Sequence, residues 1–258
     1  MKKTVLLLLI LLCFFHSGSS ESKNWHEKRS THFIVYFRNA PLKFVYKVID
    51  KAEDYYRDIA DSLGFRRYQF WLWENRAKIY IYDEAQGYQQ ATGSPKWSYG
   101  HVMPRDKIIH SFYNERRFID QILPHELGHI IFREFVGFEN TSIPLWLDEG
   151  VACYQEFRRR PTADAIVRAA IEKGKFIDLE RLSSFTSRSM ADDETVQVFY
   201  AESVSLIAFL IAEYGNDRFV VFCRRLRDKK DFLEALKASF RVEGLKQLEE
   251  AWKDYLFR

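Results

Sequence analysis

The segment from Phe118 to Val136 constrains the fold of this chain most strongly, because apolar residues fill so many of its positions. They recur at positions 118, 119, 122, 123, 127, 130, 131, 132 and 135. This spacing predicts a helix that is buried on most of its circumference. Proline is tolerated in the first turn of a helix and not in its middle, so Pro124 indicates that the helix begins near Asp120, which would cap it.

Two histidines and a glutamate interrupt this apolar pattern in the sequence HELGH, residues 125–129. Four positions apart on a helix, His125 and His129 share one face and can both bind a metal ion at about 2.0–2.1 Å. Glu126 lies beside them, where a carboxylate can accept a proton from water activated by the metal. An accidental match occurs in on the order of one chain in a hundred of this length. Two unpaired imidazoles in an apolar core would also be costly. We therefore predict a site for one zinc ion.

A third protein ligand is needed, because catalytic zinc usually has three and a water. No histidine follows His129, so the ligand has to be a carboxylate from another segment. The sequence SIPLWLDEGVACYQEF, residues 142–157, reads as a helix that Pro144 opens, with Asp148 and Glu149 in its first turns. Acidic residues are common in the first turn of any helix. The pattern alone therefore leaves Asp148 and Glu149 open as the ligand.

The rest of the chain predicts an α+β fold in which the strands come first. Alternating apolar residues indicate strands at 31–39 and 77–83, and two more within 98–112 around a turn at 104–106. Residues 41–65 read as a helix and 87–93 as a short helix or turn, and nearly everything after Phe118 reads as helical.

Charge and the N-terminal segment limit the classes of function. The formal charge is +3, and without Lys2 and Lys3 it is +1, so nucleic-acid binding by a basic surface is not predicted. Residues 1–20 read as a secretory signal peptide, with an apolar run from Val5 to Phe15 followed by small residues. We expect an exported protein, associated with a membrane only if this segment stays uncleaved. Cys153 and Cys223 then form either a disulfide or two buried thiols.

HELGH, nineteen further residues and the glutamate of WLDEGVA resemble the gluzincin metallopeptidases. The closest resemblance is to the peptidase MA-like family, which has a tryptophan-leucine-x-glutamate-glycine-x-alanine signature. HFIVYF, KIYIY, LPHELGH and YAESVSLIAFLIAEYG also occur in the order of that family, although only the zinc segments are highly specific. The resemblance implies that His125, His129 and Glu149 bind zinc and that Glu126 is the general base.

The resemblance also implies a thermolysin-like zincin fold within a catalytic domain of residues 21–258. Its upper lobe, about 31–136, holds a small mixed sheet and the zinc helix, and its lower lobe, about 137–258, is helical. Substrate peptides of such enzymes pair with an edge strand, for which residues 107–112 are our candidate and an ordinary paired strand the alternative.

Further site roles follow from the same resemblance. Tyr200 takes the position of a tyrosine that stabilises the oxyanion, with an ordinary core residue as the alternative. His101, His110 and Tyr154 are further candidates for that role. Some gluzincins place an aspartate four residues after the ligand glutamate, to hold a histidine, but here that residue is Cys153.

These features predict an exported zinc metallopeptidase that acts on a peptide or protein substrate. No glycine-x-methionine-glutamate-asparagine motif of the kind used by aminopeptidases of this clan is present, which favours an endopeptidase. Two alternatives stay open: a peptidase-like binding module, and a zinc hydrolase of a substrate other than protein. The sequence predicts no oligomeric state.

Overall fold

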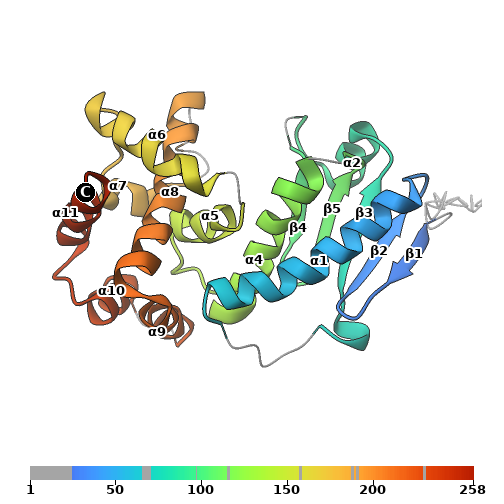
Figure 1. The fold of residues 1–258 in the computed structure, drawn as a ribbon, viewed down its shortest axis with the longest axis horizontal. Helices are drawn as coiled ribbons and strands as arrows, with labels where there is room; N and C mark the ends of the chain where they lie inside the picture. The colour runs from blue at the N-terminus through green and yellow to red at the C-terminus, as the bar shows by residue number, and fades with distance from the viewer. Residues whose placement is uncertain are drawn as a thin grey trace, which may run out of the picture.

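The computed structural model describes residues 25–65, 71–96, 98–114, 117–156, 159–186, 189, 192–228 and 231–258. The signal peptide predicted for residues 1–20 lies outside the described residues. Figure 1 shows a lobe with the sheet at one end of the molecule and a lobe of helices at the other, with helices α4 and α5 between them.

Within the described residues, five strands form one mixed sheet in the order β1-β2-β3-β5-β4. Their bounds are β1 His26–Arg29, β2 Phe33–Phe37, β3 Ala77–Tyr82, β4 Gly100–Met103 and β5 Ile108–Phe112. β2, β3 and β5 run parallel, while β1 and β4 pair antiparallel at the two edges. The predicted strands at 31–39, 77–83 and within 98–112 are confirmed. β1 was missed, because the sequence HEKR has no apolar residue that would mark it as a strand, and the structure shows it by its backbone pairing with β2.

The prediction that residues 107–112 form an edge strand is wrong. β5 pairs with β3 on one side and with β4 on the other. The turn at residues 104–107 folds β4 back along β5, so that β4 occupies the edge that β5 would otherwise leave open. The strand available for pairing at this end of the sheet is therefore β4.

Helices α1 (Leu42–Ser62) and α4 (Leu123–Val136) pack against each other and lie across the sheet (Figure 1). The buried residues of α1 recur at three- and four-residue spacing, which confirms the amphipathic helix predicted at 41–65. Pro41 precedes its first turn, and Gly64 follows its end with a φ of +71° that favours glycine. A 3-10 turn η1 (Trp73–Asn75) precedes β3, and a short helix α2 (Ala85–Thr92) follows β3.

The helix that carries the HELGH sequence begins earlier than predicted. A π-helical turn, η2 (Phe118–Ile122), runs directly into α4, so Asp120 lies inside the helical run and does not cap it. The Leu123 amide donates to the Phe118 carbonyl five residues earlier. A proline ring crowds the carbonyl four residues before it, and the wider π turn gives Pro124 room there. The burial expected for this helix is confirmed.

The second lobe consists of helices that pack around α8. Their bounds are α5 Leu145–Tyr154, α6 Arg160–Glu172, α7 Leu179–Ser184, α8 Asp193–Tyr214, α9 Asn216–Arg227, α10 Phe232–Phe240 and α11 Leu245–Leu256. α8 contacts α5, α6, α9 and α11. Among the described helices, α8 alone has the length and apolar composition of a membrane span, and 61% of its most apolar stretch is buried inside the protein. Cys153 and Cys223 are both buried free thiols, which decides between the two alternatives for these cysteines.

Candidate zinc site and cleft

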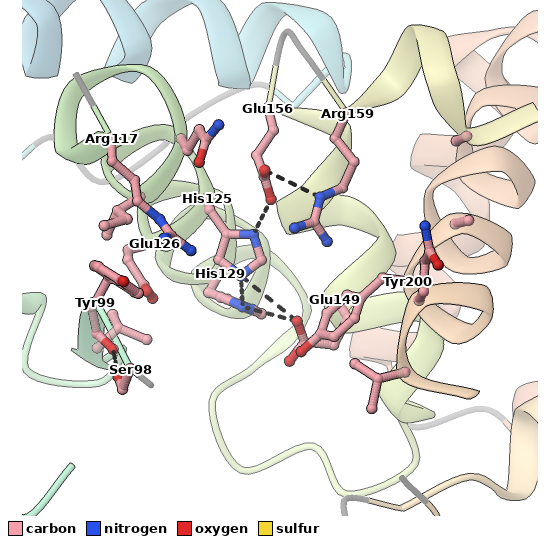
Figure 2. Close-up of a pocket in the computed structure, with 18 of the residues that line it drawn as sticks. Ser98, Tyr99, Arg117, His125, Glu126, His129, Glu149, Glu156, Arg159 and Tyr200 are labelled. Atoms are coloured by element: carbon pink, nitrogen blue, oxygen red, sulfur yellow. Dashed lines mark hydrogen bonds and ion pairs between the residues drawn. The ribbon is translucent and has the colours of Figure 1, made fainter. Parts of the chain in front are cut away.

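Three side chains from two helices converge at the junction between the lobes (Figure 2). His125 and His129 of α4 present their Nε2 atoms 3.2 Å apart. From α5, the Oε2 atom of Glu149 lies 3.7 Å from Nε2 of His125 and 3.8 Å from Nε2 of His129. The three predicted ligands therefore come together as one cluster.

The size of this triangle suits a zinc ion. A point equidistant from its three corners lies about 2.1 Å from each, and zinc binds histidine nitrogen and carboxylate oxygen at about 2.0–2.2 Å. The local field also favours a cation. Burial lowers the pKa of His129, but Asp148 and Glu149 outweigh burial and raise it to about 10. The donor set, its spacing and its charge all fit one zinc ion.

Two glycines of the sequence signatures let the helices approach closely enough to form this cluster. A Cβ added to Gly128 of α4 would lie 2.9 Å from the Cα atom of Ala152 in α5. A Cβ added to Gly150 of α5 would lie 2.5 Å from the backbone oxygen of Ser203 in α8. Because real Cβ atoms essentially never approach so closely, the backbones of α4, α5 and α8 need glycine at these positions. Glu149 is thereby held opposite the two histidines.

The structure separates Asp148 from Glu149, which the sequence pattern alone left open. Asp148 accepts a hydrogen bond from Nδ1 of His129 at 3.2 Å, on the side of the ring away from the triangle. Arg133 donates to the same carboxylate through Nε and Nη2, at 2.9 and 2.8 Å. Burial raises the pKa of Asp148, but His129 and Arg133 outweigh it and hold the pKa at about 2. Asp148 therefore orients a histidine, while Glu149 faces the ion position.

His125 is oriented by Glu156, which the sequence analysis did not identify. Its Nδ1 atom donates to Oε1 of Glu156 at 2.9 Å, and Nε of Arg159 lies 3.2 Å from Oε2 of the same carboxylate. Cys153 lies close by, with Sγ 3.7 Å from Nδ1 of His125. Glu156 thus holds the histidine from a position three residues after Cys153. No spacing rule in the sequence pointed to it.

Glu126 is buried beside the triangle, against strand β4. A Cβ added to Gly100 would lie 2.7 Å from Oε1 of Glu126, so the carboxylate fills the space that glycine leaves free. Burial raises the pKa of the Glu126 carboxyl, while His125 and His129 act in the opposite direction. A carboxyl with a raised pKa that lies next to a cation site is suited to exchanging a proton during a reaction.

All five predicted site residues line one cavity of about 780 Å³. Its walls come from β4, η2, α4, α5, α6 and α8. Tyr200 of α8 lies across the cavity from Glu126, and burial raises the pKa of its phenol well above the ordinary value, so it stays protonated. Of the further candidates, His101 lines the cavity, whereas His110 and Tyr154 are absent from the described lining residues. The catalytic roles of Glu126 and Tyr200 stay predictions.

A mixed sheet, a buried HELGH helix and a glutamate from the following helix make up the arrangement of the gluzincin class of zinc metallopeptidases. A family model described as Peptidase MA superfamily matches residues 73–258. The match covers well over half of the chain, which therefore belongs to this superfamily, and the family assignment made from the sequence is confirmed. None of the curated proteins compared with the chain matches it.

Two solved structures of yeast LTA4 hydrolase, each with a TM-score above 0.5, confirm the predicted fold class. Native yeast LTA4 hydrolase has a TM-score of 0.54 at 18% identity, with 88% of this chain and 38% of that chain covered. Its complex with bestatin has a TM-score of 0.54 at 15% identity, with 84% and 36% covered. The M1 zinc metallopeptidase from Deinococcus radiodurans has a TM-score of 0.48 at 14% identity, with 89% of this chain and 51% of that chain covered. The chain spans little more than a third of the yeast protein.

Proposed function

We propose that this protein hydrolyses peptide bonds with one zinc ion held by His125, His129 and Glu149. The observation that carries the proposal is the triangle of ligand atoms. Its edges of 3.2, 3.7 and 3.8 Å suit zinc, and all three ligand residues line the cavity, where water and substrate can reach the ion. When bound, zinc supplies Lewis-acid chemistry that activates water and polarises an amide carbonyl. Membership of a peptidase superfamily supports a peptide substrate.

Glu126 and Tyr200 divide the remaining work. Glu126 accepts a proton from the attacking water and delivers it to the nitrogen of the leaving amine, which cannot depart as an anion. Tyr200 donates a hydrogen bond from its phenol to the oxygen that gains negative charge when the carbonyl is attacked. The raised pKa of each group supports its role. Glu126 can hold a proton that it has accepted, and the Tyr200 phenol stays protonated and can donate a hydrogen bond.

We assign the binding of the substrate backbone to strand β4 in place of residues 107–112. β4 is the edge strand at the cleft, and Gly100, His101 and Val102 line the cavity. An extended peptide can add to such an edge through main-chain hydrogen bonds, which depend little on its side chains. The absence of an aminopeptidase motif in the sequence favours cleavage within a chain. We therefore propose an endopeptidase.

We also propose that the protein is exported, with residues 1–20 as the signal peptide and residues 21–258 as the catalytic domain. The basic start, short apolar run and small residues of the N-terminal segment support this proposal.

The test is metal analysis of the purified protein, together with digestion of a mixed peptide library with and without a chelator. Glu126→Gln should keep its zinc and lose hydrolysis by about 100-fold or more, because it lacks a general base. Glu139→Gln is the control, because this exposed glutamate pairs with Arg105 on the surface. A zinc-bound protein that cleaves no peptide, or a Glu126→Gln variant as active as the unaltered protein, would reject the proposed function.

A further inference from the structure

Two matching chains of contacts hold the two histidines. His129 donates to Asp148, which Arg133 holds, and His125 donates to Glu156, near which Arg159 lies. In each series of contacts a largely buried carboxylate lies between an imidazole and a guanidinium. Each carboxylate therefore orients the ring of a proposed zinc ligand and is itself held by an arginine side chain.

The two arginines differ in what else they contact. Arg133 donates its remaining hydrogen bond to the backbone oxygen of Asn140, away from the cleft. Arg159 lines the cavity, and its Cζ atom lies 5.1 Å from the centre of the Tyr200 ring. It also donates from Nη1 to Sγ of Cys153 at 3.4 Å. Figure 2 shows Arg159 on the side of the cleft where Glu156 and Tyr200 also lie.

We propose that Arg159 is a positioning residue that fixes both His125, through Glu156, and the ring of Tyr200. The proposal rests on the proposed function, since it joins a zinc ligand to the group that stabilises the oxyanion. One planar guanidinium can serve both partners because it pairs with the carboxylate through Nε while its Cζ atom lies over an aromatic ring.

The structure gives this coupling a physical reason. Glu156 and Arg159 lie three residues apart between α5 and α6, where the Arg159 amide donates to the Glu156 carbonyl at 3.0 Å, whereas Tyr200 is on α8. Held separately, the ligand and the phenol could shift independently by a fraction of an ångström. A shared contact with Arg159 keeps their separation fixed, and such precision matters because small misplacements at a reacting centre greatly reduce the rate.

The experiment compares Arg159→Ala and Arg159→Lys with two control variants. Arg133→Ala breaks the other chain of contacts and leaves Tyr200 untouched. Arg160→Ala removes a neighbouring guanidinium that lies 4.4 Å from the ring centre of a different residue, Tyr154. Lysine keeps the charge beside Glu156 but cannot donate in a planar fork and also cover a ring.

The first measurement is the dissociation constant for zinc, obtained by titrating the metal-free protein. Arg159→Ala and Arg133→Ala should each raise it by about 10-fold, the usual effect of losing an outer partner of a ligand. Arg160→Ala should leave it unchanged. If Arg159→Ala binds zinc as tightly as the unaltered protein, the proposal is overturned.

The second measurement follows the ring resonances of Tyr200 in protein with ¹³C-labelled tyrosine, assigned by their absence from Tyr200→Phe. They should move in Arg159→Ala and Arg159→Lys and stay in place in Arg133→Ala and Arg160→Ala. Unmoved resonances in both Arg159 variants overturn the coupling, whether or not the protein cleaves peptides. This readout therefore separates failure of the coupling from failure of the proposed function.

The third measurement is a double-mutant cycle on peptide cleavage. Arg159→Ala should lower kcat with little change in KM, and should lower it less in a Tyr200→Phe background, because the phenol it positions is already gone. The effects of Arg133→Ala and Tyr200→Phe on kcat should multiply. Equal effects of Arg159→Ala in both backgrounds would contradict the coupling.

Discussion

Gly100 of strand β4 lies directly against Glu126 of helix α4. A Cβ added to Gly100 would stand 2.7 Å from Oε1 of Glu126 and 2.5 Å from Cγ2 of Ile122. The backbone of the edge strand and the carboxylate of the proposed general base are therefore in close contact. Any side chain at position 100 would displace the carboxylate. The strand proposed to bind the substrate backbone also sets the position of the group proposed to transfer protons.

Gly100→Ala should therefore reduce peptide cleavage without removing zinc. The new methyl group pushes the Glu126 carboxylate aside, and a misplacement of about 1 Å can cost on the order of 100-fold in rate. Steady-state kinetics and zinc titration would measure the two effects. Gly87→Ala is the control, because this glycine is in helix α2 and its added Cβ meets nothing nearer than 4.0 Å. Full activity in Gly100→Ala would contradict the proposed place of Glu126.

Glu149→Ala should weaken zinc retention far more than Asp148→Ala. Glu149 faces both histidine Nε2 atoms, at 3.7 and 3.8 Å, so its loss leaves two protein ligands for the ion. Asp148 contacts His129 at Nδ1, on the side of the ring away from the ion position, and the loss of such a partner costs about 10- to 100-fold in affinity. Zinc titration of both metal-free variants gives the ranking. A reversed ranking would make Asp148 the ligand.

Gly150→Ala should destabilise the protein and weaken zinc binding together. Its Cβ would lie 2.5 Å from the backbone oxygen of Ser203, so α5 has to move away from α8 and carry Glu149 with it. Overpacking of this kind costs about 1–3 kcal/mol. Urea unfolding of the metal-free protein measures the first effect and zinc titration the second. Unchanged zinc affinity would show that α5 can shift without moving Glu149.

The sequence predicted the parts of the site that follow from helix geometry. His125 and His129 lie on one face because residues four apart on any helix do so, and no tertiary information is needed. Glu149 required the family resemblance, since acidic residues at 148 and 149 suit a helix start equally well. The structure distinguishes them by where their side chains point: Glu149 faces the Nε2 atoms of both histidines, and Asp148 faces Nδ1 of His129. These directions depend on how α5 crosses α4 at Gly128.

The parts that the sequence missed depend on contacts between distant segments. β1 has a polar sequence and exists because its backbone pairs with β2. The sequence predicts the turn between β4 and β5 but does not show which of the two strands also pairs with β3, and in the structure that strand is β5. Glu156 lies just after α5, where no helical spacing relates it to His125. In each case a neighbour in space, rather than the local pattern, determines the role.

Glu202 of α8 provides a test of the second lobe that does not involve the zinc site. Its side chain is fully buried, and Oε1 accepts a hydrogen bond from the Ile177 amide at 2.9 Å. Within the described part of the chain, Oε2 has no hydrogen-bond partner. Burial raises the pKa of this carboxyl to about 9, because the charged form would have to be desolvated.

This raised pKa makes the native state less stable as pH rises. Between the ordinary value of 4.5 and about 9, the unfolded chain loses the proton while the folded protein keeps it. The folded state then binds more protons, so the free energy of unfolding falls with increasing pH over this window.

Glu202→Gln, which is neutral at all pH values, should remove that decline. The variant should gain on the order of 4 kcal/mol over the unaltered protein between pH 5 and pH 8, at about 1.36 kcal/mol per pH unit. Urea unfolding at both pH values measures the gain, with Glu250→Gln, an exposed residue of α11, as the control. A difference between Glu202→Gln and the unaltered protein that stays constant with pH would mean that Glu202 is ionised in the fold.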